Sequence, residues 1–272
     1  MTHVFPPPLD RHYPVVGGRV VTRALEAHVV DHCNLTCAEC CSLSPLLPHW
    51  LVDPADLADD LAIARDVLAP GVFKLVGGEP LLHPDLVELV HVVRRSGIAP
   101  RISITTNGLL LDRTPDALWE AIDALTISVY PRPALSPEAT MATELRAARF
   151  GVTLNWKHQT EFVVMNRREP TTDTAETLGI FHGCWIRERC HMLRGGRFYT
   201  CTRPPHFQAY HRGALDFTGD GIALAGLDAA TLHGYLTSDR PLEACAHCFG
   251  GSGATMVPHR LLTRDELVRL RR

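Results

Sequence analysis

Apolar and polar residues alternate along the first 165 residues in a pattern that predicts strands followed by helices. Short runs rich in Val, Ile and Leu are separated by longer segments in which apolar residues recur every three or four positions. The short runs predict strands over residues 26–31, 72–76, 101–105, 125–129, 152–156 and 160–165. This order predicts an α/β protein with a parallel sheet, because parallel neighbours need a crossover that a helix usually supplies.

The predicted helices are marked by capping residues as well as by periodicity. Asp53 can cap a helix that has Pro54 at its first position. Gly97 can end a helix over residues 85–96, and two further helical stretches lie near residues 114–122 and 136–149. The carboxyl ends of the strands should then meet at one edge of the sheet, where functional residues of such folds gather.

Composition narrows the class of protein. The chain has 272 residues, long enough for one sizeable core and a smaller appendage, and its formal net charge of −3 gives no electrostatic basis for binding nucleic acid or anionic membranes. The chain does not open on a basic segment followed by an apolar run, and no apolar run approaches membrane-spanning length. We therefore expect a cytoplasmic protein, whose nine cysteines are reduced thiols that bind metal and not disulfides.

Three cysteines lie together shortly after the first predicted strand. Cys33, Cys37 and Cys40 have the spacing C-x3-C-x2-C. Three thiolates can hold a [4Fe–4S] cluster and leave its fourth iron open to a small molecule, whereas a structural zinc site or a simple electron carrier would need a fourth protein ligand. The spacing resembles that of the radical S-adenosylmethionine (SAM) superfamily.

The resemblance continues along the chain in the order of that superfamily. Residues 77–80 resemble its GGEP segment, and residues 105–108 resemble the TTNG that ends its third strand. The resemblance implies that SAM is bound by Gly77, Gly78, Glu79, Pro80, Thr105, Asn107 and Ser128, with Glu79 accepting from the SAM ammonium group. The two glycines suit this role, because a ligand approaches the backbone most closely where no Cβ intervenes. Glu39 departs from the family, which usually has an aromatic residue there against the adenine, so we assign it no stacking role.

The same resemblance implies the domain organisation. Residues 21–168 are expected to form a partial (β/α)6 radical SAM barrel, preceded by an N-terminal extension over residues 1–20. Arg167 would end the last barrel strand, where an inward side chain could hold a polar substrate or the SAM carboxylate. Beyond it the alternation fades, and residues 169–272 are loop-rich with many Cys, Gly, Pro and His, as in small metal-stabilised domains.

Five further cysteines lie in this second region. Cys184, Cys201 in a G-x4-C segment, and the pair Cys245 and Cys248 resemble the ligands of the auxiliary [4Fe–4S] cluster in twitch-type radical SAM enzymes. A zinc site formed by the same cysteines with a nearby histidine is the alternative. Cys190 is left over, and it could be a replacement ligand, a hydrogen-atom donor or an inert thiol.

Together these features resemble the small twitch-type enzymes of aminoglycoside and aminocyclitol (antibiotic) biosynthesis. The resemblance implies two clusters and SAM, with a 5′-deoxyadenosyl radical that takes hydrogen from a carbinol carbon of an amino sugar or aminocyclitol and leads to a ketone. Epimerisation of the same substrates with Cys190 as hydrogen donor is one alternative, and modification of a ribosomal peptide is another. A non-enzymatic iron–sulfur carrier would leave GGEP and TTNG unexplained. The expected partners are the small-molecule substrate and a flavodoxin- or ferredoxin-type reductant.

Overall fold

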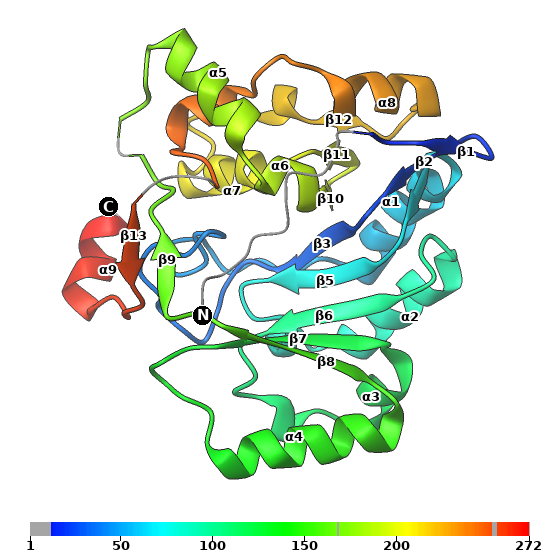
Figure 1. The fold of residues 1–272 in the computed structure, drawn as a ribbon, viewed down its shortest axis with the longest axis vertical. Coiled ribbons are helices and arrows are strands. Elements are labelled where there is room, and N and C mark those ends of the chain that lie inside the picture. The colour runs from blue at the N-terminus through cyan, green and yellow to red at the C-terminus, as the bar shows by residue number, and fades with distance from the viewer. Residues whose placement is uncertain (1–11, 168, 252–254, 272) are drawn as a thin grey trace.

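The structure is a computed structural model that describes residues 12–167, 169–251 and 255–271. Its centre is an eight-stranded sheet in the order β12-β11-β10-β3-β5-β6-β7-β8 (Figure 1). The strands span Leu25–Val30 (β3), Phe73–Gly77 (β5), Ile102–Thr106 (β6), Ala124–Val129 (β7), Thr153–His158 (β8), Met192–Arg194 (β10), Arg197–Tyr199 (β11) and Ile222–Ala223 (β12). The neighbours from β10 to β8 pair in parallel, and β11 and β12 add antiparallel strands beyond β10. The predicted α/β class with a parallel sheet is confirmed.

Four helices cover one face of this sheet, to the right of and below the strands in Figure 1. They are α1 (Pro54–Val67), α2 (Leu86–Ser96), α3 (Asp116–Ala121) and α4 (Pro137–Phe150). The Asp53 side chain accepts from the Ala55 N–H at 2.8 Å, and Gly97 ends α2 with a left-handed φ of 65°. Both predicted caps are confirmed, and the strand residues facing these helices, such as Phe73 and Ile104, are fully buried.

The opposite face of the sheet is polar. Successive strand side chains point to opposite faces, and Leu25, Ala27 and Leu75 belong to the main hydrophobic core. Glu26 and Lys74 therefore point the other way, and their side chains form an ion pair at 2.9 Å across β3 and β5. The C-terminal half of the chain packs over this face.

One predicted strand forms but joins a different sheet. Residues 160–165 were expected to give the sixth barrel strand, but β9 (Glu161–Val163) pairs antiparallel with β13 (Met256–Pro258) in a separate two-stranded sheet. The sixth parallel strand is instead β10, which pairs with β3 at the opposite end of the parallel part of the sheet from β8. The prediction of a sixth barrel strand at 160–165 is wrong, because a strand pattern does not specify the partner.

The rest of the chain surrounds this framework. The remaining elements are β1 (Val15–Val16), β2 (Arg19–Thr22), β4 (Leu68–Pro70), α5 (Thr174–Gly183), α6 (Ile186–Arg189), α7 (Arg203–Tyr210), α8 (Ala229–Thr237), α9 (Arg264–Leu270), and the 3-10 turns η1 (Pro80–Leu82), η2 (Leu111–Arg113), η3 (Thr218–Asp220) and η4 (Glu243–His247). A second, smaller hydrophobic core lies here and includes Met165, Phe181 and Phe207. The predicted boundaries at residues 20 and 168 stay predictions, and of the N-terminal extension residues 1–11 lie outside the described chain.

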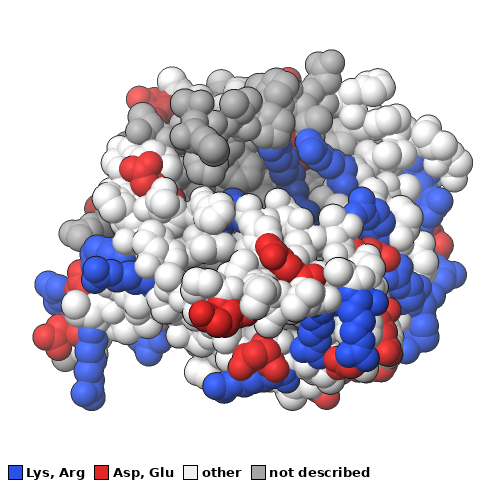
Figure 2. Space-filling model, turned by 60° about the horizontal axis from the view of Figure 1, so that its bottom comes forward, with Lys and Arg blue, Asp and Glu red and all other residues white. Residues whose placement is uncertain are grey.

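The surface carries both signs of charge. On the face in Figure 2, Lys and Arg side chains are interspersed with Asp and Glu, in line with the small net charge. Of the helices in the described ranges, none combines the length and the apolar character needed to cross a bilayer.

Candidate functional site

The loop after β3 brings the first three cysteines together. Burial raises the pKa of Cys33 to about 11 and the pKa of Cys37 and of Cys40 to about 12. Repulsion from neighbouring thiolates, Cys41 among them, adds to the rise in the pKa of Cys37 and of Cys40, so the thiols of this loop are within electrostatic range of one another. Three thiols on one loop form a donor set that fits a [4Fe–4S] cluster with one open iron.

Two donors approach the Cys33 sulfur, one from the same loop and one from the end of β6. The backbone N–H of Leu35 lies 3.4 Å from Cys33 Sγ, and the Asn107 amide lies 3.8 Å from the same sulfur. The Asn107 amide also donates to Asn34 Oδ1 at 2.7 Å. The end of β6, where TTNG was found in the sequence, therefore lies directly beside the first cysteine.

The two glycines of GGEP lie against the backbone of the cysteine loop. A Cβ on Gly77 would come 2.2 Å from the Val30 carbonyl oxygen, and one on Gly78 would come 2.0 Å from the His32 carbonyl oxygen. The Gly78 N–H donates to the Val30 carbonyl at 2.7 Å. The glycines are required here because two chain segments approach each other, a reason that differs from the ligand approach expected from the sequence.

Glu79 connects GGEP to TTNG. Its side chain is fully buried; Oε1 accepts from Leu81 N–H at 3.0 Å and Thr106 Oγ1 at 2.7 Å, and Oε2 accepts from Asn107 N–H at 2.8 Å. Burial raises the pKa of this carboxyl, and the three hydrogen bonds oppose that shift. A carboxylate can accept more than three bonds, so a contact with the SAM ammonium stays a prediction.

The other predicted SAM residues lie at the same end of the sheet. Pro80 begins η1 after β5, Thr105 lies near the end of β6, and Ser128 lies near the end of β7. The structure thus brings the three motifs to one edge, as the parallel-sheet prediction required.

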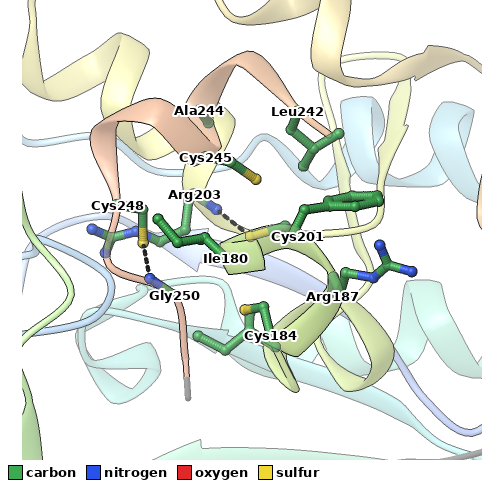
Figure 3. A pocket seen from close by; sticks show the side chains of 12 residues that line it. Ile180, Cys184, Arg187, Cys201, Arg203, Leu242, Ala244, Cys245, Cys248 and Gly250 are labelled. Carbon is green, nitrogen blue, oxygen red and sulfur yellow. Dashed lines mark hydrogen bonds between the residues drawn. The ribbon is translucent and has the colours of Figure 1, made fainter. Parts of the chain in front are cut away.

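The second cysteine set surrounds a cavity beside the smaller core. Figure 3 shows the thiols of Cys184, Cys201, Cys245 and Cys248 around one space, which is also lined by apolar side chains such as Ile180 and Leu242. Burial raises the pKa of Cys201 well above its ordinary value, and repulsion from the other three thiolates adds to this shift. The four predicted ligands are therefore neighbours, although they come from three separate stretches of chain.

Backbone N–H groups are aimed at three of these sulfurs. Gly251 N lies 3.1 Å from Cys184 Sγ, Gly250 N lies 3.2 Å from Cys248 Sγ, and Arg203 N lies 3.4 Å from Cys201 Sγ. Within the described ranges, no three His, Cys, Asp or Glu side chains are arranged to hold a single metal ion. Four thiols around one cavity, with N–H donors to the sulfurs, form a donor set that suits a [4Fe–4S] cluster and also a zinc ion.

Asp220 holds the segment that carries the last two cysteines. Its carboxylate accepts from the backbone N–H groups of Glu243 at 2.6 Å and Ala244 at 2.8 Å, at the start of η4. Burial raises the pKa of Asp220 to about 6 against the effect of these two bonds. Asp220 is a supporting residue that the sequence did not single out.

Cys190 packs against the smaller core together with cysteines of the second set, but it does not line the cavity that they surround. The groups that influence its thiol are Glu26, Lys74, Cys41 and Lys157, and burial raises its pKa well above the ordinary value. Cys190 precedes β10, whose Met192 pairs with Glu26, and its thiol is within electrostatic range of the Glu26–Lys74 ion pair. Sequence reasoning missed that pair, although the charges inside two strand-like runs were a usable signal.

Arg167 lies beside the last cysteine loop. Its guanidinium pairs with Glu176 and lies over the Phe249 ring at 4.4 Å, and its backbone N–H donates to the His247 carbonyl at 3.3 Å. These contacts hold the segment that precedes the second region. A contact of Arg167 with substrate or SAM stays a prediction.

Comparison with known sequences identifies the first half of the chain. The model of the radical SAM superfamily matches residues 28–138. A GTP 3′,8-cyclase of Microcystis aeruginosa is 36% identical over 103 residues, which are 36% of this chain and 31% of the relative. A GTP 3′,8-cyclase of Streptomyces coelicolor is 39% identical over 118 residues, which are 41% of this chain and 34% of the relative. The chain thus spans about a third of the length of these relatives.

A solved structure resembles the fold over most of the chain. The crystal structure of BtrN in complex with AdoMet and 2-DOIA superposes with a TM-score of 0.50 and 16% identity, covering 80% of this chain and 83% of that one. At this identity the likeness concerns the fold alone. The three cysteines, GGEP and TTNG all fall inside residues 28–138, the stretch that matches the radical SAM superfamily.

Proposed function

We propose that the chain is a twitch-type radical SAM enzyme that oxidises a carbinol carbon of an amino sugar or aminocyclitol to a ketone. When bound, the cofactors would supply one electron and a 5′-deoxyadenosyl radical that takes the hydrogen atom from the carbinol carbon. The substrate would then lose its hydroxyl proton to solvent and one electron to a second cluster, which gives the ketone. A flavodoxin- or ferredoxin-type protein would deliver the first electron, and reduced thiols suit the cytoplasm.

The single observation that carries oxidation is the second cysteine set. Cys184, Cys201, Cys245 and Cys248 line one cavity, with backbone N–H groups directed at three of the sulfurs. Four protein ligands leave a cluster no open iron, so a group held there would transfer electrons and would not bind SAM. Oxidation of an alcohol needs such an electron acceptor.

The polar face of the sheet supports a hydroxylated or amino-bearing substrate. Glu26 can accept from a hydroxyl or ammonium group, and Lys74 can donate to a hydroxyl. The Lys74 side chain is 28% exposed and the Glu26 side chain 8%, and a partly exposed pair of this kind contributes little to stability. BtrN, whose fold is similar, was solved with AdoMet and 2-DOIA, so a fold of this kind can accommodate both.

GTP is a weaker candidate substrate. The cyclase relatives match only about a third of their own length. We therefore include GTP in the tests below without proposing it.

Epimerisation is the second candidate, and the position of Cys190 favours it. A hydrogen-atom donor must keep its S–H bond, and burial raises the pKa of this thiol so that it stays protonated at neutral pH. The thiol is also within electrostatic range of Glu26 and Lys74, where we place the substrate. Modification of a ribosomal peptide remains a third outcome of the substrate screen.

Iron and zinc analysis tests the cluster assignment. After anaerobic reconstitution we expect about eight irons per chain, and about four when Cys245 and Cys248 are both replaced by Ala. A Cys41→Ala control should keep all eight. About four irons with one zinc in the unmodified chain would overturn the auxiliary cluster.

Turnover in deuterated water separates oxidation from epimerisation. Amino sugars, aminocyclitols, GTP and peptides are screened for SAM-dependent change by mass spectrometry. A ketone product is lighter by two mass units, whereas an epimer formed through an exchangeable S–H gains one deuterium on carbon. Cys190→Ala should leave oxidation and both clusters intact. If this variant keeps its iron and SAM cleavage but loses product, the epimerase is correct; if it loses half its iron, Cys190 is a cluster ligand.

A further inference from the structure

A histidine from the far end of the chain contacts one of the first three cysteines. His259 Nε2 lies 3.3 Å from Cys37 Sγ, although the residues are 222 positions apart. The other donors close to the predicted cluster sulfurs in the described chain are backbone N–H groups and the more distant Asn107 amide. His259 thus differs from these donors because it approaches a cluster sulfur with an imidazole ring.

Backbone hydrogen bonds hold this contact in place on both sides. The Ala38 N–H donates to the Arg260 carbonyl at 2.9 Å, and the Leu262 N–H donates to the Thr36 carbonyl at 2.7 Å. Thr36 Oγ1 also donates to the Leu262 carbonyl at 3.2 Å. The residues on either side of Cys37 are therefore tied to the segment that follows His259.

Aromatic rings orient the imidazole. Tyr130, at the end of β7, stacks on His259 with ring centroids 4.8 Å apart and an interplanar angle of 20°. The ring centroid of Phe162 in β9 lies 5.4 Å from that of the same imidazole, and the backbone N–H of His259 donates to the Thr160 carbonyl at 2.8 Å. Because β13 pairs with β9, this segment presents His259 to Cys37 from a fixed direction.

We propose that His259 donates a hydrogen bond from Nε2 to the Cys37 sulfur of the first cluster and raises the reduction potential of that cluster. This inference rests on the proposed function only in placing a cluster on Cys33, Cys37 and Cys40. A reduced cluster carries one more negative charge than an oxidised one, so a donor to its sulfur stabilises the reduced form more. Removing the donor should make reduction less favourable without removing a ligand.

Two substitutions separate the hydrogen bond from the packing. His259→Phe keeps a ring against Tyr130 but has no N–H, whereas His259→Gln loses the ring but can place an amide N–H near Nε2. His91→Ala, at an exposed position of α2, is the matched control. The measurement is an anaerobic redox titration of the full chain followed by electron paramagnetic resonance, with the first cluster identified by the change in its signal when SAM is added.

We expect His259→Phe to retain about eight irons and to show a reduction equilibrium constant about tenfold less favourable, which is about 59 mV more negative for a one-electron couple. His259→Gln should recover most of the shift, and His91→Ala should match the unmodified protein. An unchanged potential in His259→Phe, with the SAM-responsive signal present, would overturn the role of His259 and leave the proposed function standing. If both His259 variants lose the first cluster, the imidazole is needed for assembly and the tuning role is wrong. If the unmodified protein lacks any SAM-responsive cluster, the proposed function fails and this inference fails with it.

Discussion

Replacing Gly78 by Ala would test whether the GGEP segment is held to the cysteine loop through the backbone. The new Cβ would lie 2.0 Å from the His32 carbonyl oxygen, 2.4 Å from its carbon and 2.8 Å from the Asp31 carbonyl oxygen. Non-bonded carbon atoms prefer separations of about 3.5 Å or more. The atoms in the way belong to the backbone and cannot rotate aside, so one of the two segments must move by more than about 1 Å.

The expected cost follows from two contributions. Overpacking of this kind destabilises proteins by about 1–3 kcal/mol. The Gly78 N–H bond to the Val30 carbonyl, now 2.7 Å, would be stretched, at a cost of about 1 kcal/mol. The free energy of unfolding should fall by about 2–4 kcal/mol, a large share of the stability of an ordinary domain. Because His32 directly precedes Cys33, the first cluster should also assemble poorly.

Urea unfolding of the apo-protein followed by circular dichroism measures the stability, and iron content with SAM binding measures the site. The matched control is Gly234→Ala in α8, where an added Cβ meets nothing within 4 Å. A helix-interior Gly-to-Ala change with open space should stabilise by up to about 1 kcal/mol. If Gly78→Ala unfolds at the same urea concentration as the unmodified chain and keeps its iron, the close approach does not hold the site together.

Three further predictions concern other supports of the two sites. The Asp31 side chain is 1% exposed and accepts two hydrogen bonds of 2.7 Å from Arg194. Asp31→Ala should therefore lower the free energy of unfolding in urea by about 3–5 kcal/mol. An unchanged unfolding midpoint would show that this ion pair does not secure β10 to β3. Glu79→Gln should weaken SAM binding in calorimetry but leave the iron content unchanged, because a neutral amide binds an ammonium less strongly, and equal SAM affinity would contradict the assigned role. The pKa of Asp220 is raised to about 6, so the folded state holds the carboxyl proton of Asp220 more tightly than the unfolded state does. Protonated Asp220 therefore stabilises the fold at low pH, and this stabilisation is lost as pH rises from about 4 to 6. The loss is at most about 3 kcal/mol, and it should be absent from an Asp220→Asn variant when unfolding is measured across that range.

Local features of the fold were predictable from the sequence alone. Asp53 caps α1 and Gly97 ends α2 where the pattern placed them, because both depend on hydrogen bonds and dihedral angles within a few residues. The first cysteine set was predictable for the same reason, since its ligands lie within eight residues and their spacing carries the chemistry.

Features that depend on pairing between distant segments were decided by the tertiary structure. The sequence showed a strand at 160–165 but not that β13 would be its partner, nor that β10 would pair with β3. Glu26 and Lys74 each put a charge inside a strand-like run, but only the register of β3 and β5 decided that they pair. His259 had no feature that linked it to Cys37, because a contact across 222 positions depends on which surfaces bury each other, and no local pattern encodes that choice.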